Sequence, residues 1–201
     1  MCDKVLKEIN AIKRDIVRTS YYSKEGHLGS SFSILDILYV LYRRIMKFSA
    51  KNVDDVDRDY MILSKGHASL GHAAILNSIG VISDEQLTKY CSYESILGGH
   101  LNRLKVPGVE ASTGSLGHGI SISIGIALAM KIKKQTNKVF VIVGDGEINE
   151  GTFWESMLLG AHHNLNNLCC IIDYNRSNDR ALKLDPIKDK IKAFGWDVTV
   201  I

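Results

Sequence analysis

The chain has 201 residues, 45% of them hydrophobic, and its 25 basic and 22 acidic residues give a net charge of +3. This size and apolar content suffice for one buried core, so we expect a single domain over residues 1–201. The nearly balanced charge forms no basic stripe, which argues against nucleic-acid binding. The longest apolar run, residues 120–130, is interrupted by serine and glycine, so no membrane segment is expected.

The amino terminus and the cysteines indicate the compartment. The first turns mix acidic and basic residues, which excludes a secretory signal peptide. The four cysteines have no Cys-x-x-Cys spacing, and Cys169 and Cys170 fall in an apolar run, where we expect small buried fillers. These features fit a protein of the reducing cytoplasm.

The first half of the chain opens with helices. Apolar residues at helical spacing predict helices over residues 3–20 and 31–46. Residues 58–64 read as a strand, followed by a helix from about 70 to 79 and another after the cap at Ser83. No linker or low-complexity segment interrupts this pattern.

The second half follows a loop-rich stretch at residues 98–115 and continues to alternate. The expected elements are a helix at 117–133, a strand at 139–143, a helix at 152–164, a strand at 168–172, a helix from Pro186 to 194, and a strand at 196–201. Strand, helix and strand in succession predict a right-handed crossover between parallel strands. The fold class is therefore α/β, a parallel sheet flanked by helices.

Polar side chains follow two of the predicted strands. Asp145 comes after the apolar run 139–143, and Asn175 comes shortly after the run 168–172. The carboxyl ends of neighbouring parallel strands lie side by side, and open α/β sheets bind ligands there. One carboxylate and one amide carbonyl suit Mg²⁺ or Ca²⁺ also held by phosphate oxygens, whereas zinc would favour thiolates or imidazoles.

Glycines surround this aspartate. Gly144 and Gly146 remove side chains where a diphosphate would approach the backbone, and the following helix start offers unpaired amide hydrogens. A Gly-Asp-Gly turn alone is more often ordinary turn chemistry. The second strand with Asn175 makes a diphosphate and metal cradle the better interpretation.

Histidines are placed unusually. Five of the seven follow a glycine, and four of these five lie in predicted loops; the five are His27, His67, His72, His100 and His118. Any one of them could be a hydrogen-bonded structural side chain. As a set aimed at one edge of the sheet, they are better interpreted as proton handlers and as hydroxyl or phosphate ligands. We expect His72, one helical turn after His67, to be structural.

Ordered motifs over nearly the whole chain resemble the amino-terminal, thiamine diphosphate-binding part of transketolases, of the kind encoded as a separate subunit. The motifs are Gly26-His27, Ser64-Lys65-Gly66-His67, Gly99-His100, Gly108-Val109-Glu110, residues 112–119, Gly144-Asp145-Gly146-Glu147, Asn149-Glu150-Gly151, Trp154-Glu155, Asp173-Tyr174-Asn175 and Ala193-Phe194-Gly195-Trp196. The resemblance implies the thiamine diphosphate-binding fold and roles for individual residues.

Those roles fall into three groups. The catalytic set implied by the resemblance is His27, His67, His100 and Glu150, the last at a subunit interface; Glu150 could equally be a helix-start glutamate favoured by the dipole. The implied cofactor-binding set is His67, Gly114, Ser115, Leu116, Gly144, Asp145, Gly146, Glu147 and Asn175. The implied metal ligands are Asp145, Asn175 and, by position, the carbonyl of Ser177.

One loop departs from the family pattern. After Asn175, transketolases usually present a segment ending in Asp-Gly, whereas here residues 176–181 are Arg-Ser-Asn-Asp-Arg-Ala. The added arginines could reach a phosphate or a different donor sugar. The choice of substrate therefore stays open.

The resemblance also implies a partner. A complete enzyme needs a carboxyl-terminal, pyrimidine-binding subunit, and together they would transfer a two-carbon ketol unit between sugar phosphates as a homo- or hetero-oligomer. The chain ends earlier than such subunits usually do, consistent with truncation at its carboxyl end. Alternatives are the alpha subunit of a 2-oxo-acid dehydrogenase, a deoxyxylulose-phosphate synthase, or a non-catalytic cofactor-binding or assembly module.

Overall fold

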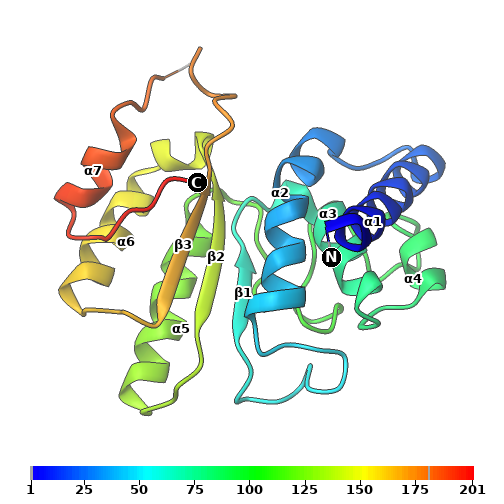
Figure 1. The fold of residues 1–201 in the computed structure, drawn as a ribbon, viewed down its shortest axis with the longest axis horizontal. Helices are drawn as coiled ribbons and strands as arrows, with labels where there is room; N and C mark the ends of the chain where they lie inside the picture. The colour runs from blue at the N-terminus through cyan, green and yellow to red at the C-terminus, as the bar shows by residue number, and fades with distance from the viewer. Residues whose placement is uncertain (1, 181) are drawn as a thin grey trace.

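A sheet of three parallel strands lies at the centre of the computed structural model, which describes residues 2–180 and 182–201 (Figure 1). The strands are β1 (Tyr60–Leu63), β2 (Val139–Gly144) and β3 (Leu168–Asp173), in the spatial order β1-β2-β3. Tyr60 is opposite Val139, which in turn is opposite Leu168. The carboxyl ends of all three strands therefore meet at one edge, as the apolar runs predict.

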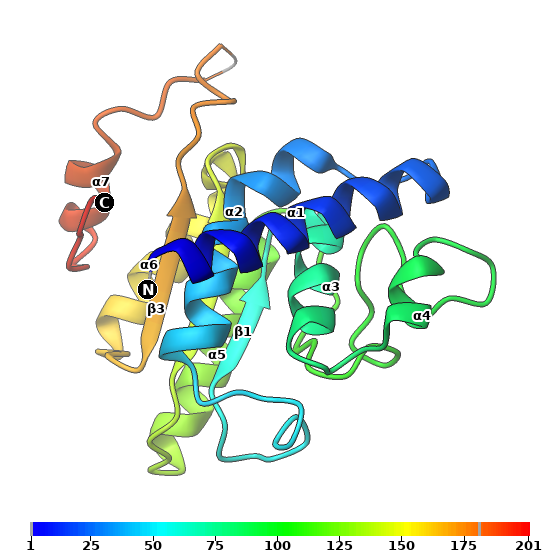
Figure 2. The ribbon, with the colours of Figure 1, turned by 45° about the vertical axis from the view of Figure 1, so that its right-hand side comes forward.

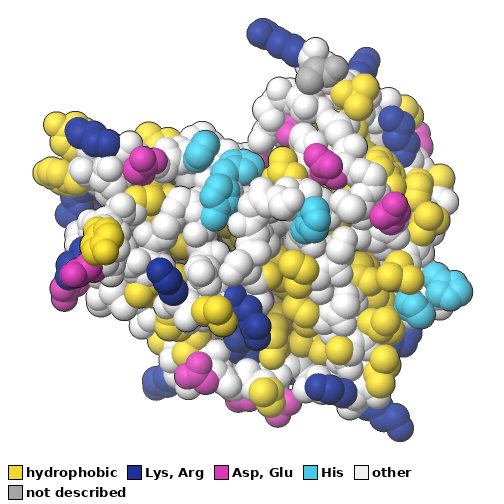
Figure 3. Space-filling model, turned by 180° about the vertical axis from the view of Figure 1, so that it is seen from behind, with side chains coloured by type: hydrophobic (Ala, Val, Ile, Leu, Met, Phe, Trp, Pro, Cys, Tyr) yellow, Lys and Arg dark blue, Asp and Glu magenta, His cyan; other side chains and the backbone are white. Residues whose placement is uncertain are grey.

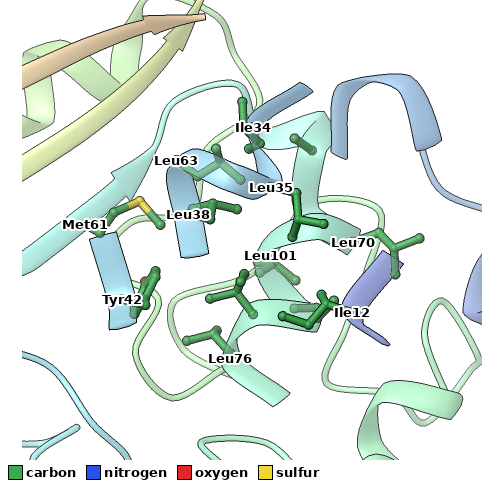
Figure 4. Packing of buried hydrophobic residues seen from close by; sticks show 14 of the residues in the cluster. Ile12, Ile34, Leu35, Leu38, Tyr42, Met61, Leu63, Leu70, Leu76 and Leu101 are labelled. Atoms are coloured by element: carbon green, nitrogen blue, oxygen red, sulfur yellow. The ribbon is translucent and has the colours of Figure 1, made fainter. Parts of the chain in front are cut away.

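Helices α1 (Cys2–Ser23), α2 (Leu28–Val40), α3 (Ser69–Ser78) and α4 (Asp84–Thr88) lie on the β1 side of the molecule (Figures 1 and 2). Short helical turns follow α2 at Leu41–Ile45 and precede α3 at Gly66–Ala68. Their apolar side chains pack with Met61 and Leu63 of β1 (Figure 4). Neighbouring strand residues point to opposite faces, so Ile62 packs on the other side of the sheet.

That other side is covered by α5 (His118–Ile132), α6 (Gly151–His162) and α7 (Ile187–Ala193), with a short turn at Gly146–Asn149 before α6. These helices share a second core with Val139, Val141 and Val143 of β2. β2 is buried along its whole length because it has a strand on each side and helices on both faces. None of the described helices is long and apolar enough to span a membrane.

Two sequence predictions were wrong. Residues 196–201 form no strand; instead the Trp196 indole donates a hydrogen bond to the Met157 carbonyl at 2.8 Å and packs against Gly160, so α6 holds this segment. β3 is also not wholly buried, because it has a strand partner on one side only among the described residues. Cys169 is therefore exposed rather than a core filler, while Cys170 is half-buried.

His72 is a structural histidine, as expected from its position in α3. Its ring is 2% exposed, and its Nε2 lies 2.9 Å from the Tyr42 hydroxyl. Burial lowers the pKa of His72 from 6.5 to about 3, because the charged form cannot be hydrated.

This burial predicts acid sensitivity. The folded pKa lies below the unfolded one, so the stability is fully present above pH 6.5 and is lost as the pH falls toward 3. The loss should reach about 1.4 kcal/mol per pH unit within that window. In urea unfolding measured at several pH values, His72→Gln should flatten this dependence, whereas His162→Gln, at the exposed end of α6, should leave it unchanged. An unchanged slope in His72→Gln would contradict the assignment.

Candidate functional site

Four loops converge at the carboxyl edge of the sheet. They follow β1, β2 and β3, and the fourth precedes α5. Hydrogen bonds join them across the chain: the Ser64 hydroxyl donates to Glu147, the Gly117 amide donates to the same carboxylate at 2.8 Å, and the Asp145 amide donates to the Asp173 carbonyl at 3.2 Å. The edge is thus a connected surface built from distant parts of the sequence.

Asp145 sits at the centre of this edge. Its side chain is only 3% exposed, and three neutral donors reach it: the Gly146 amide at 2.8 Å, the Ser177 hydroxyl at 3.0 Å and the Asn178 amide at 3.4 Å. Among the described residues it has no ion-pair partner. A carboxylate has about four lone-pair sites, so one acceptor position remains. A buried carboxylate without a cation favours a cation at this position.

Ser177 lies between Asp145 and Asn175 and is hydrogen-bonded to both. The Asn175 amide oxygen accepts a hydrogen bond from the Ser177 backbone amide at 2.9 Å, and the Ser177 hydroxyl in turn bonds Asp145. Ser177 therefore links the two side chains that were expected to hold a metal. Both Asn175 and Ser177 are exposed, so a ligand can reach them from solvent.

A buried ion pair lies next to this group, and sequence reasoning gave it no role. The Lys65 ammonium is 2.6 Å from Asp173 Oδ2, with the two residues 2% and 7% exposed. The Ser33 hydroxyl is 2.7 and 2.6 Å from the two Asp173 oxygens. The available signal was that Lys65 and Asp173, of opposite charge, each mark the carboxyl end of a strand.

Glu147, which was predicted to bind the cofactor, is buried and hydrogen-bonded within the protein. Its side chain is 1% exposed, and it accepts from Ser64, from the Gly117 amide and from the Gly144 amide at 3.2 Å. Burial raises the pKa of this carboxyl, and these hydrogen bonds partly oppose the rise. In this arrangement Glu147 ties three loops together at this edge of the sheet.

The three predicted catalytic histidines, His27, His67 and His100, approach one another. His27 precedes α2, and its ring is 5.6 Å from that of His67, which lies in the turn after β1. Burial lowers the pKa of His67, with further lowering from the Lys65 charge and then from His27 and His100. His67 therefore favours the neutral form, which can accept or donate a hydrogen bond. Figure 3 shows histidine side chains gathered at the upper edge of one face.

Gly114 lies against His100. Its φ is +149°, and a Cβ there would be 2.8 Å from His100 Cδ2, so a larger residue would displace the histidine. Ser115 is exposed and Leu116 is half-buried, so both are accessible beside this loop. The close approach explains a glycine here and brings the predicted pyrimidine-contacting loop next to a predicted catalytic side chain.

Glu150 is exposed and directly precedes α6, where its side chain makes no capping hydrogen bond. Gly117, with a φ of +82°, approaches it closely: a Cβ there would lie 2.7 Å from Glu150 Cβ.

Arg176, in the loop that departs from the family pattern, already forms ion pairs with Asp185 at 2.8 Å and with Asp179 at 3.4 Å. These bonds direct Arg176 back into its own loop.

The oxygen donors at this edge fit a hard divalent cation bound together with a diphosphate. The described residues contain no group of three or more His, Cys, Asp or Glu arranged to hold a metal by themselves. A cation held by one carboxylate, one amide oxygen and a nearby backbone carbonyl therefore needs additional oxygen ligands. A diphosphate would supply them. Exposed Asn175 beside buried Asp145 leaves an open side for such a ligand.

Comparison with known proteins identifies the family. The family model described as "Transketolase, thiamine diphosphate binding domain" matches residues 2–201. The chain belongs to the transketolase family. This transketolase domain is 37% identical over 191 residues to an apulose-4-phosphate transketolase subunit of Phocaeicola vulgatus, covering 92% of this chain and 68% of that protein. It is 38% identical over 202 residues to the subunit of the same name in Actinobacillus succinogenes, covering 98% and 73%.

The solved transketolase of Leishmania mexicana has the same fold, with a TM-score of 0.87 at 28% identity. The match covers 98% of this chain and 31% of that structure, so this transketolase domain corresponds to about a third of a complete enzyme. The α/β fold and the thiamine diphosphate-binding class that the motifs predict are confirmed.

Proposed function

We propose that the chain is the diphosphate-binding subunit of a split transketolase, which transfers a two-carbon ketol unit from a ketose phosphate to an aldose acceptor. The observation that carries this proposal is the buried Asp145 carboxylate beside Asn175, at the carboxyl edge of a transketolase-type sheet. Relatives whose names describe them as transketolase subunits support a division into two chains. Their names make apulose 4-phosphate the first donor to test.

The chain's part in the reaction is to bind and orient the cofactor. Asp145, the Asn175 amide oxygen and the Ser177 carbonyl would hold Mg²⁺, or Ca²⁺, against the diphosphate, and Gly144 and Gly146 would leave room for it. Gly114, Ser115 and Leu116 would contact the pyrimidine ring. When bound, thiamine diphosphate would supply the nucleophilic and electron-accepting chemistry that transfer of a ketol unit requires.

The histidines would handle the sugar. Neutral His67, with His27 5.6 Å from it ring to ring, can accept a proton from a substrate hydroxyl or donate to its oxygen. His100 would complete this set from the loop beside Gly114. Glu150, which is exposed at the start of α6, would contact a second subunit.

A carboxyl-terminal, pyrimidine-binding subunit is the proposed partner, in a hetero-oligomer. The alternatives are a subunit of another thiamine diphosphate enzyme, either a 2-oxo-acid dehydrogenase or a deoxyxylulose-phosphate synthase, or a non-catalytic binding module. The extent of the family match and the similarity to transketolase subunits favour ketol transfer.

Two measurements test the proposal. Calorimetric titration of thiamine diphosphate should show binding that requires magnesium and disappears with a chelator. Addition of a pyrimidine-binding subunit should then produce ketol transfer from a ketose phosphate, whereas a 2-oxo acid should not be consumed. Magnesium-dependent binding without transfer by any such pair would indicate the non-catalytic module, and absence of binding with and without the partner would refute the proposal.

A further inference from the structure

The Lys65 side chain crosses the carboxyl edge of the sheet. Lys65 follows β1, yet its ammonium pairs with Asp173 at the end of β3, so the side chain passes over the end of β2. A Cβ at Gly144 would be 3.9 Å from Lys65 Cδ, in ordinary van der Waals contact. Burying both charges is costly unless they are paired and hydrogen-bonded, as they are here. Such an arrangement calls for a reason beyond stability.

Asp173 fixes the orientation of the neighbouring Asn175 amide. Asp173 Oδ2 is 3.2 Å from Asn175 Nδ2, and the Ser33 hydroxyl, which donates to Asp173, is 3.4 Å from the same nitrogen. An ionised carboxylate only accepts hydrogen bonds, so the amide must present its NH₂ group to it. The amide oxygen is then turned the other way, toward the Ser177 backbone.

This orientation matters because an amide can bind a cation only through its oxygen. If the amide were rotated by half a turn, its nitrogen would face the side of Asp145 and could not serve as a ligand. Lys65 contributes in a second way. By pairing with Asp173 it neutralises that carboxylate, which then anchors Asn175 and does not compete for the cation.

We infer that Lys65, through Asp173 and Ser33, is a positioning residue that sets the affinity of the site for its divalent cation. The inference rests on the proposed function, in which Asp145 and Asn175 bind magnesium with thiamine diphosphate. Partners that orient a metal ligand typically contribute about 10- to 100-fold to metal affinity. Replacement of Lys65 or Asp173 should weaken magnesium binding by that factor.

The experiment measures the magnesium concentration that half-saturates binding of thiamine diphosphate, by calorimetry, together with the unfolding temperature. The variants are Lys65→Met, Asp173→Asn and the double variant. Arg58→Met is the matched control, because Arg58 and Glu110 form another buried ion pair, at the amino end of β1. This control should lower the unfolding temperature and leave the magnesium requirement unchanged.

The double variant separates positioning from stability. It removes both charges, so the unfolding temperature should recover relative to Lys65→Met, whereas the magnesium requirement should stay raised because no carboxylate orients Asn175. Lys65→Arg, which keeps the charge, should restore most of the affinity. Recovery of both quantities together in the double variant would overturn the inference and leave a purely structural ion pair. Absence of magnesium-dependent thiamine diphosphate binding by the wild-type chain, both alone and with a pyrimidine-binding subunit, would overturn the proposed function and this inference with it.

Discussion

The Asp145→Asn substitution is expected to abolish magnesium-dependent binding of thiamine diphosphate. The substitution keeps the shape of the side chain and removes its charge, so the proposed cation loses its only carboxylate ligand. The affinity for magnesium should fall by more than about 100-fold, since loss of a residue that merely orients a metal ligand already lowers the affinity by about 10- to 100-fold. Calorimetric titration of magnesium and thiamine diphosphate into the purified Asp145→Asn chain measures this directly.

Asp59 provides the matched control at the other end of the sheet. It is also buried, at 4% exposed, and it accepts hydrogen bonds from the Lys47 and Lys138 backbone amides, each at 2.8 Å. Asp59→Asn should destabilise the fold by about 1 to 3 kcal/mol, because a buried acceptor is lost to those amides, and should leave magnesium binding intact. If Asp145→Asn bound magnesium like the wild type, the cradle would have to be placed elsewhere.

Two glycines of α5 should respond in opposite ways to the same substitution. A Cβ at Gly119 would lie 2.2 Å from Ser64 Oγ and 2.7 Å from Ser64 Cα, so α5 and the end of β1 would have to separate. No atom comes within 4 Å of a Cβ at Gly125. Gly119→Ala should therefore cost roughly 1 to 3 kcal/mol, as overpacking does, whereas Gly125→Ala should stabilise by up to about 1 kcal/mol through helix propensity.

Urea unfolding followed by far-ultraviolet circular dichroism compares the two variants. Because Ser64 also donates to Glu147, Gly119→Ala should weaken cofactor binding as well, while Gly125→Ala should not. Stabilisation by both substitutions would show that α5 can move away from β1 without cost.

The sheet, and the edge at which the candidate ligands Asp145 and Asn175 lie, could be predicted because their signals are local. Apolar runs that end in Asp145 and Asn175 specify both the strands and the edge at which the side chains meet. Helical spacing located α1, α3, α5 and α6 to within a few residues. The segment after Trp196 was misassigned because an apolar run does not reveal that one indole hydrogen bond holds it to α6.

The supports of the site could not be predicted in the same way. Lys65 and Asp173 are 108 residues apart, and their pairing depends on strand order and register, which no single segment encodes. Glu147 follows the glycine turn and was assigned to the cofactor, but the structure encloses it among three loops. Whether a polar residue faces a ligand or its own neighbours depends on packing, which spacing does not determine.

The hydrogen bond between Ser33 and Asp173 joins residues 140 positions apart, so the site is complete only when α2 and the end of β3 are packed together. A fragment that contains α1 to α4 and β1 alone would have no complete cofactor site. A ligand that binds only the finished cradle would therefore stabilise the whole domain by mass action, and cofactor supply in the cell would protect this chain from unfolding and degradation.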